Sequence, residues 1–158
     1  MCIRDRICIV LSSGTATAEK ISKKAAKRLA AVAASETKIP AGYTKLTGEA
    51  LREFVSDVTV SGLSERSAGW SYHVYRAPNG KQRGTATNVG DKNKDSGKWT
   101  IDGDTYCSKW RKWADRKKTC YHVYTGATED YFTITTDGEF WSSKKFKVTR
   151  VKGNAENI

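Results

Sequence analysis

The feature that most constrains the fold is a series of short alternating segments joined by turn signals. From Val58 onward, β-branched and aromatic residues tend to occupy every second position, which is the pattern of half-buried strands. Three Asx-Gly pairs interrupt this alternation, at Asn79-Gly80, Asp102-Gly103 and Asp137-Gly138. Each pair predicts a two-residue hairpin turn, because both turn positions tolerate positive φ. The chain should therefore form a mainly β, antiparallel meander.

The number of segments predicts about seven or eight strands. Sheets of this width usually close or stack to protect their edges, so we expect a small barrel or sandwich. Alternation places Trp70, Tyr72 and Val74 on one face of their strand. It likewise places Tyr121 and Val123 on one face of theirs. We expect these five residues in the core.

A short helix of about two turns should precede the sheet. In the segment 47–55 (TGEALREFV), Thr47 is followed by a Glu in the first turn, which is a helix start signal. The triplet Pro40-Ala41-Gly42 marks a boundary just upstream. Because 158 residues suit one domain, we expect a single β domain over residues 40–154.

The first residues predict export. An apolar run at 7–11 precedes Ala16-Thr17-Ala18, a small-x-small pattern that signal peptidase cleaves. We interpret residues 1–18 as a signal peptide and expect a periplasmic or secreted protein. We expect no transmembrane anchor, because the run is too short to span a bilayer. Residues 2–6 (CIRDR) look like a translated sequencing adapter that has overwritten the start of the signal. The alternative is a cytosolic start followed by a β-strand.

Residues 19–39 predict a basic helical or linker segment. Apolar side chains recur at helical spacing in this segment, at Ile21, Ala25, Leu29 and Val32. Basic residues cluster beside them, at Lys20, Lys23, Lys24, Lys27 and Arg28. One interpretation is contact with an anionic membrane or polymer. The other is a solvated linker between the cleavage site and the domain.

Two cysteines predict a disulfide. Cys107 and Cys120 lie in two segments that would run antiparallel on either side of a loop. Opposite positions on one face of a hairpin bring the two Cβ atoms close enough for a disulfide after small adjustments. The competing interpretation is a metal site, but a separation of twelve intervening residues lacks the paired C-x-x-C geometry that zinc sites favour. We expect the disulfide and no metal.

The loop between these segments is the most function-like feature. It combines two Trp with six basic residues and comprises Lys109, Trp110, Arg111, Lys112, Trp113, Arg116, Lys117 and Lys118. Such residues can stack on sugars or bases while their cations contact anions. Lys and Arg outnumber Asp and Glu by 28 to 17, which also favours anionic partners. The alternative is that the two Trp form a lid on the end of the barrel. A second basic run comprises Lys144, Lys145, Lys147, Arg150 and Lys152.

Motifs that carry catalytic chemistry are absent from the sequence. It contains no Gly-x-Ser-x-Gly, no His-Glu-x-x-His and no phosphate-binding glycine loop. Two histidines, His73 and His122, could form a metal or haem site with Tyr75 and Tyr124, but half-exposed histidines on a sheet surface are the simpler interpretation. We therefore expect neither an enzyme nor a cofactor.

Several short motifs resemble the bacterial family called domain of unknown function 995. They run from Leu46-Thr47-Gly48 through Gly97-Lys98-Trp99, Asp102-Gly103, Cys107 and Cys120 to Lys152-Gly153-Asn154, and cover residues 40–154. Ala155 stands where the family has a Pro. The resemblance implies a short exported protein, mostly from alphaproteobacteria, with no established activity and no assigned catalytic residues.

Three functions remain open. The leading hypothesis is a non-catalytic exported domain whose basic Trp-bearing loop contacts an anionic glycan, lipopolysaccharide or other envelope polyanion, with nucleic acid a less favoured partner. The second is a lipocalin-like carrier of a small apolar ligand. A large enclosed apolar cavity would favour it, whereas a core filled by Trp70, Trp99 and Trp141 would exclude it. The third is a module that binds or inhibits another protein. The oligomeric state is left open.

Overall fold

The computed structural model describes residues 15–63, 71–88, 91–145 and 147–158, with side-chain environments from residue 23 onward. The apolar run at 7–11 and Trp70 lie outside the described residues. The helical elements are α1 (Thr15–Glu36), α2 (Gly48–Val55) and the short turn η1 (Ala114–Arg116). The strands are β1 (Thr44–Lys45), β2 (Val58–Leu63), β3 (Ser71–Arg76), β4 (Lys81–Asn88), β5 (Asp91–Asp102), β6 (Thr105–Trp110), β7 (Lys118–Thr125), β8 (Tyr131–Thr135), β9 (Phe140–Ser142) and β10 (Thr149–Lys152).

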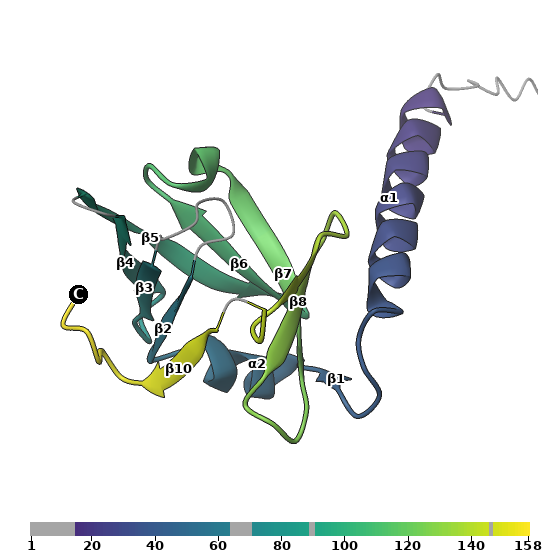
Figure 1. Cartoon of the computed structure of the whole chain (residues 1–158). Coiled ribbons are helices and arrows are strands. Elements are labelled where there is room, and N and C mark those ends of the chain that lie inside the picture. The colour runs from purple at the N-terminus through teal and green to yellow at the C-terminus, as the bar shows by residue number, and fades with distance from the viewer. Residues whose placement is uncertain (1–14, 64–70, 89–90, 146) are drawn as a thin grey trace, which may run out of the picture.

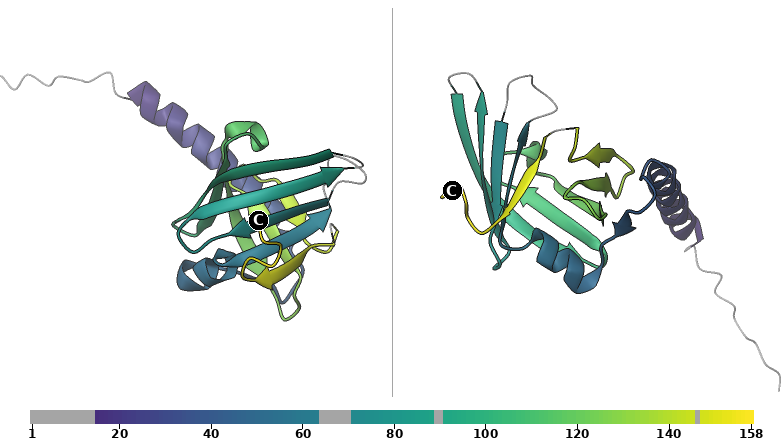
Figure 2. Two further views of the ribbon diagram at one scale, coloured as in Figure 1. Left: turned by 90° about the vertical axis from the view of Figure 1, so that its left-hand side faces the viewer. Right: turned by 60° about the horizontal axis from the view of Figure 1, so that its bottom comes forward.

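The strands form one antiparallel sheet, as the alternation predicts. Its order is β10-β2-β3-β4-β5-β6-β7-β8-β9, and β1 pairs with the end of β7. Eight of the strands have four residues or more, while β1 and β9 have two and three. Figures 1 and 2 show that the sheet curls into a half-barrel. The expected barrel or sandwich is therefore realised as a single curled sheet whose pairing order ends at β10 and β9.

The register places one set of side chains on the inner face of the half-barrel. Cross-strand partners project from the same face of a sheet, so the face can be followed from strand to strand. The pairs that define the inner face include Val60 with Val74, Arg76 with Gln82, Tyr106 with Tyr121, and Val123 with Thr133. The core face assigned from the sequence is thus confirmed for Tyr72, Val74, Tyr121 and Val123, of which Val74 and Val123 are fully buried.

Helix α2 closes one end of the inner face. Leu51 and Val55 are 0% and 2% exposed, and they pack into a cluster with Trp99, Tyr106 and other inner-face residues. The apolar positions of α2 recur at i and i+4, so one stripe of this short helix faces the sheet. The helix begins after Thr47, whose carbonyl accepts the first helical bond from Leu51. The helix expected at 47–55 is confirmed.

Two of the three predicted turns differ in length from the expectation. At Asn79-Gly80, the Gly80 amide bonds to the Ala77 carbonyl and the Ala77 amide bonds to Lys81, so the loop has three residues. The Asp137-Gly138 turn has the same pattern, with bonds between Thr135 and both Gly138 and Glu139. In each turn the Gly has a positive φ and the Asx residue does not. Three-residue loops of this kind are typical of a type I turn followed by a left-handed Gly.

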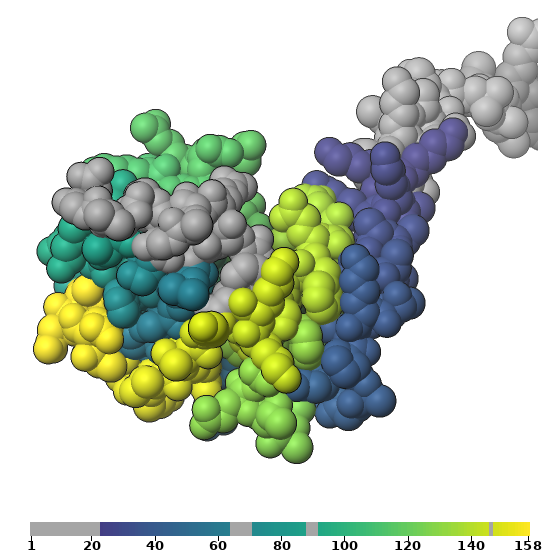
Figure 3. All heavy atoms as spheres, viewed as in Figure 1, coloured from purple at the N-terminus to yellow at the C-terminus, as the bar shows by residue number. Residues whose placement is uncertain are grey.

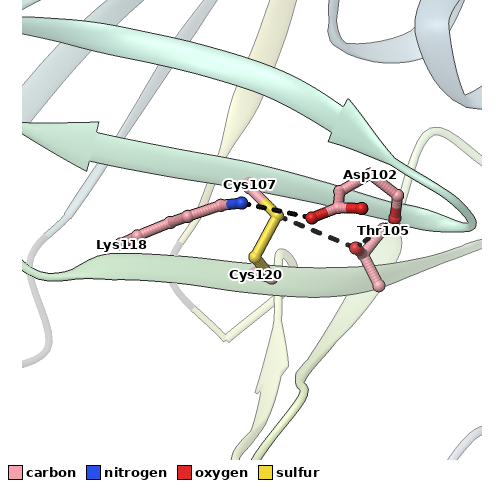
Figure 4. Close-up of a disulfide and its surroundings, with 5 residues drawn as sticks. All are labelled: Asp102, Thr105, Cys107, Lys118 and Cys120. Atoms are coloured by element: carbon pink, nitrogen blue, oxygen red, sulfur yellow. Dashed lines mark hydrogen bonds and ion pairs between the residues drawn. A yellow bond between two sulfur atoms is a disulfide. The ribbon is translucent and has the colours of Figure 1, made fainter.

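The disulfide between Cys107 and Cys120 is present. The two cysteines are direct partners across β6 and β7, and their sulfur atoms are 2.05 Å apart. Cys107 is 1% exposed. Figure 4 shows the bond on the outer side of the strand pair, beside the ion pair of Lys118 with Asp102 at 3.2 Å. The bridge therefore closes the base of the loop that carries Trp110 and Trp113.

Helix α1 contacts the sheet through its last turns. Ala31 lies against Gly138, the Ser35 hydroxyl bonds to the Gly138 carbonyl, and Tyr124 donates a hydrogen bond to Glu36. Leu29, from the predicted apolar stripe, is 71% exposed. Figures 1 and 3 show the rest of the helix leading away from the sheet. The predicted basic helix is therefore present, and it runs through the expected cleavage position after Ala18.

Candidate functional site

A cavity of about 780 Å³ lies inside the half-barrel. Its walls come from both halves of the sheet, with Val60 and Val74 on one side and Thr133 and Trp141 on the other. The cavity opens to solvent, and its lining is as polar as it is apolar. Ligand pockets in proteins have volumes of roughly 300–1,000 Å³. The interior is therefore large enough for a small organic molecule.

Tryptophan does not fill this interior in the part of the chain that the structure describes. Trp99 is 3% exposed, and its indole N–H bonds to the Ala77 carbonyl at 2.9 Å, so it belongs to the core near α2. Trp141 is half-buried and lines the cavity wall, where its ring lies 5.5 Å from that of Tyr131. Among the described residues, Trp99 and Trp141 therefore do not fill the space between the two halves of the sheet.

Tyrosines dominate the polar part of the lining. Tyr72, Tyr106, Tyr121 and Tyr131 all line the cavity, and the rings of Tyr106 and Tyr121 stack at 5.8 Å. Burial raises the pKa of Tyr131 above its ordinary value, and burial likewise raises the pKa of Tyr121. Tyr131 and Tyr121 are therefore neutral at physiological pH and offer hydroxyl groups to the cavity rather than charges.

Arg76 brings a positive charge into this tyrosine cluster. Its Nε donates a hydrogen bond to the Tyr106 hydroxyl at 2.8 Å, and its guanidinium carbon lies 4.8 Å from the centre of the Tyr106 ring. Burial lowers the pKa of Arg76, but the surrounding tyrosines outweigh this effect and the pKa is raised overall. Within the described residues, no carboxylate lies within 4 Å of the guanidinium.

Two further charged side chains line the cavity. Lys38 follows α1 and lies 5.8 Å from the centre of the Phe140 ring. Glu139 follows the Gly138 turn and is exposed. Together with Arg76, these residues give the described lining a net charge of one positive unit. The inner surface therefore has the same sign of charge as the whole chain, which carries a net +11.

The two Trp of the predicted site lie at the rim of the half-barrel. Trp110 and Trp113 pack on each other with ring centres 4.8 Å apart, and both are half-buried. A Cβ on Gly84 would lie 2.6 Å from the Trp113 ring and 3.1 Å from that of Trp110. Only a residue without a side chain lets the rings approach β4 this closely. This arrangement corresponds to the lid interpretation of the two Trp.

Asp95 anchors the loop that follows Trp110. One carboxylate oxygen accepts the backbone amides of Lys112 and Trp113 at 2.9 and 2.8 Å, and the other accepts that of Ser96 at 2.7 Å. Burial raises the pKa of Asp95, but these three amides and the Lys112 charge outweigh it, so the pKa lies below its ordinary value. A charged carboxylate with three amide donors holds a loop firmly.

The cations of the loop are exposed and meet other cations on the outer face. Lys109, Arg111, Lys112, Arg116, Lys117 and Lys118 all point into solvent. Arg111 and Lys112 line a groove of about 650 Å³ together with Arg83, Lys92 and Lys94 from β4 and β5. We call these five residues the basic groove. The acidic residues Asp95 and Glu156 also line it, so cations outnumber acidic side chains by five to two. The sequence analysis found the loop cations and missed Arg83, Lys92 and Lys94, because they come from other strands.

Part of the second basic run does not join this groove. Arg150 donates a hydrogen bond to the Phe54 carbonyl, and Lys152 donates one to the Ser56 carbonyl. Both residues therefore lie against α2 and the segment after it. Figure 1 shows β10 and α2 at the opposite end of the sheet from the loop between β6 and β7. Arg150 and Lys152 thus belong to a separate surface.

The two histidines do not form a common site. His73 is in β3 and His122 in β7, four strand spacings or roughly 19 Å apart along the sheet. The His73 Nδ1 shares a 2.8 Å hydrogen bond with Ser61, while Tyr75 bonds to Asp57 and Tyr124 to Glu36. Burial and the nearby Lys45 lower the pKa of His122. The described residues contain no cluster of three or more His, Cys, Asp or Glu that could hold a metal ion.

Comparisons with protein-family models, with curated proteins and with solved structures give no match to this chain. The family resemblance therefore rests on its short motifs alone. Across the described ranges, no helix is long and apolar enough to cross a membrane.

Proposed function

We propose that the protein binds a small, partly apolar molecule inside the half-barrel. The observation that carries this proposal is the 780 Å³ cavity, whose walls are aromatic and aliphatic and include four tyrosines. Small-molecule sites are usually concave and largely preformed, with apolar walls and polar groups that orient the ligand. Because the cavity opens to solvent, a ligand can enter without unfolding the sheet. This is the carrier hypothesis rather than an enzymatic one.

The proposal is tested by filling the cavity. Thr133 is a half-buried residue of the cavity wall, and Thr133→Phe adds a ring to that wall. We expect the variant to bind the neutral probe N-phenyl-1-naphthylamine at least about tenfold more weakly than the native chain, measured by probe fluorescence. Thr100→Phe is the matched control, because Thr100 pairs with Cys107 and projects from the outer face. A native chain that does not bind the probe, or equal losses in both variants, would contradict the proposal.

We propose a second function for the outer face, which is binding of an anionic envelope polymer such as a glycan or lipopolysaccharide. The specific support is the basic groove, where two cations of the anchored loop lie beside three from β4 and β5. The earlier hypothesis assigned stacking to Trp110 and Trp113, but these rings pack against Gly84. The cations therefore carry this proposal, and the Trp pair supports the loop.

This second function is tested by its dependence on charge and salt. We expect the native chain to be retained on immobilised heparin and eluted by added salt, since such binding releases counterions. A double variant, Arg111→Glu with Lys112→Glu, should elute at clearly lower salt. Arg150→Glu with Lys152→Glu changes the net charge equally at the other end of the sheet and is the matched control. Equal shifts in both double variants would mean that net charge alone, and not the basic groove, is responsible.

We further propose export to the periplasm or the medium and membership of the family named above. The formed disulfide supports export, because such bonds persist in oxidising compartments. Fractionation of a bacterium that expresses the chain with residues 1–6 replaced by the basic start of a complete signal peptide tests the location. Recovery in the periplasm or medium with residues 1–18 removed supports export, and recovery of the whole chain in the cytoplasm contradicts it.

A further inference from the structure

We propose that the ligand of the cavity carries a carboxylate, which Arg76 binds, and that its apolar part lies against the surrounding walls. This inference rests on the proposed cavity function and specifies its ligand class. The charge of Arg76, its position on the inner face and its surroundings carry the argument.

The position of Arg76 follows from the register. Arg76 pairs with Val58 on one side and with Gln82 on the other, and Val58 and Gln82 are 0% and 1% exposed. Arg76 itself is half-buried, so its guanidinium loses part of its hydration, which is costly unless an anion or hydrogen bonds replace the lost water. Tyr106 supplies one hydrogen bond, and the described residues supply no anion within 4 Å. An anionic ligand would supply the missing charge.

The remaining hydrogen-bond donors fit a carboxylate. A guanidinium has five N–H donors in a planar fork, and within the described residues one of them bonds to Tyr106. The others are available to two oxygen atoms in one plane, which is the arrangement in Arg–carboxylate pairs. Gln82 and Ser108 bond to each other at 2.8 Å beside this point. The Gln82 carbonyl oxygen also accepts a hydrogen bond from the Tyr106 hydroxyl at 3.4 Å, so these side chains bond among themselves and Arg76 is the principal group for the ligand.

The rest of the cavity fits an apolar body. Phe54, Val60, Val74, Val123 and Trp141 line it, and they come from α2 and from strands in both halves of the sheet. Glu139 also lines the cavity and would repel an anion, but it is exposed to solvent, which screens its charge. Lys38 offsets this charge from the same part of the lining. The combination of one half-buried cation and apolar walls favours an amphiphile over a fully apolar molecule.

The test compares decanoate, decanol and decyltrimethylammonium, which share one alkyl chain and differ in the head group. Titration of the full chain followed by tryptophan emission gives the three dissociation constants. We expect decanoate to bind at least about tenfold more tightly than decanol, as a charge-assisted hydrogen bond would provide. The ammonium compound should bind more weakly than decanol. This comparison needs only the native protein, so it does not depend on the folding of any variant.

Two variants test whether Arg76 causes the preference for decanoate over decanol. In Arg76→Gln the ratio of decanol to decanoate dissociation constants should fall to about one, while decanol binding persists. Lys98→Gln is the matched control, because Lys98 is exposed in β5 on the outer face and lines neither the cavity nor the basic groove, and it should keep the native ratio. Equal binding of decanoate and decanol to the native chain, or an unchanged ratio in Arg76→Gln, overturns the carboxylate site but leaves the cavity function standing. Failure of all three compounds to bind overturns both.

Discussion

Asp95 is the residue on which the placement of the Trp-bearing loop depends. Its carboxylate accepts three backbone amides, two of them from Lys112 and Trp113 across the strand pair. The residue itself is 8% exposed. A buried carboxylate that lost these donors would be costly, so the loop and the carboxylate stabilise each other. Trp113 in turn lies on Gly84 and closes the rim of the half-barrel.

We predict that Asp95→Asn destabilises the protein by about 1–2 kcal/mol, because a neutral amide is a weaker acceptor than a carboxylate and brings two N–H donors in need of partners. The measurement is chemical denaturation at pH 7, followed by tryptophan emission. Asp115→Asn is the control, since Asp115 is exposed in the same loop. Equal stabilities of the native chain and Asp95→Asn would show that Asp95 does not anchor the loop.

The difference in stability between the native chain and Asp95→Asn should change with pH in one direction. The pKa of Asp95 in the folded protein lies below its ordinary value, so the carboxylate stabilises the fold fully above a pH of about 4. That contribution is lost as the pH falls through the folded-state pKa. The stability gap between the native chain and Asp95→Asn should therefore be constant from about pH 5 to 8 and shrink below about pH 4. A gap that widens on acidification would contradict this assignment.

Arg76 marks a limit of sequence reasoning about single residues. The alternation that places Tyr72 and Val74 on the inner face also places Arg76 there, two residues further along β3. The face of the strand on which Arg76 lies could therefore be predicted from the sequence. However, alternation does not tell whether a charged residue at the end of a strand projects into a cavity or into solvent. That distinction depends on Tyr106, which lies thirty positions away and becomes its neighbour only in the folded sheet.

For the strands and turns, the sequence predicts which segments pair as hairpins better than it predicts the lengths of the turns and strands. The hairpins joined at Asn79-Gly80 and Asp137-Gly138 form as expected, but each turn contains one additional loop residue. The reason is that the Asx residues keep a negative φ and only Gly80 and Gly138 adopt a positive one. The short strand β1 was not predicted, because two residues are too few to show alternation, and the strand expected after Asp137-Gly138 is only the three residues of β9.

The disulfide links β6 and β7 at the base of the Trp-bearing loop. The two cysteines are 13 positions apart in the sequence. Closing a loop of about this length should stabilise the protein by roughly 3 kcal/mol, because the crosslink lowers the entropy of the unfolded chain. We predict that the double variant Cys107→Ala with Cys120→Ala loses about this amount in denaturation at pH 7. Thr100→Ala, next to Cys107 on the outer face, is the control. A loss below about 1 kcal/mol would mean that the loop is held by Asp95 and the strand pairing alone.

The sequence predicts helix α1 but not the surface against which it packs. The apolar stripe at helical spacing predicts the helix, and the helix is present. Yet Leu29 of that stripe is 71% exposed, and the described contacts come from residues nearer the end of the helix, such as Ala31 and Ser35. Periodicity therefore identified the element but not the extent of its packing, which is set by the position of the Gly138 turn.

In the molecule as a whole, the two faces of one curled sheet have different chemistry. The inner face carries the tyrosines, the apolar walls and Arg76, while the outer face carries the disulfide and the basic groove. The sequence predicts the charge and the strand faces. It predicts that the sheet closes or stacks but not how far it curls, because the curvature arises from pairing across the entire sheet. The cavity follows from that curl and could not be located beforehand.

The most direct measurement is a two-dimensional proton–nitrogen NMR titration of the tryptophan indoles with decanoate. Trp110 and Trp141 line the cavity, whereas the indole of Trp99 is held by the Ala77 carbonyl in the core. If the half-barrel binds the amphiphile, the Trp110 and Trp141 signals shift and saturate together while that of Trp99 stays nearly unchanged. Shifts confined to residues of the basic groove, or no saturable shift at Trp110 and Trp141, would contradict an internal ligand site.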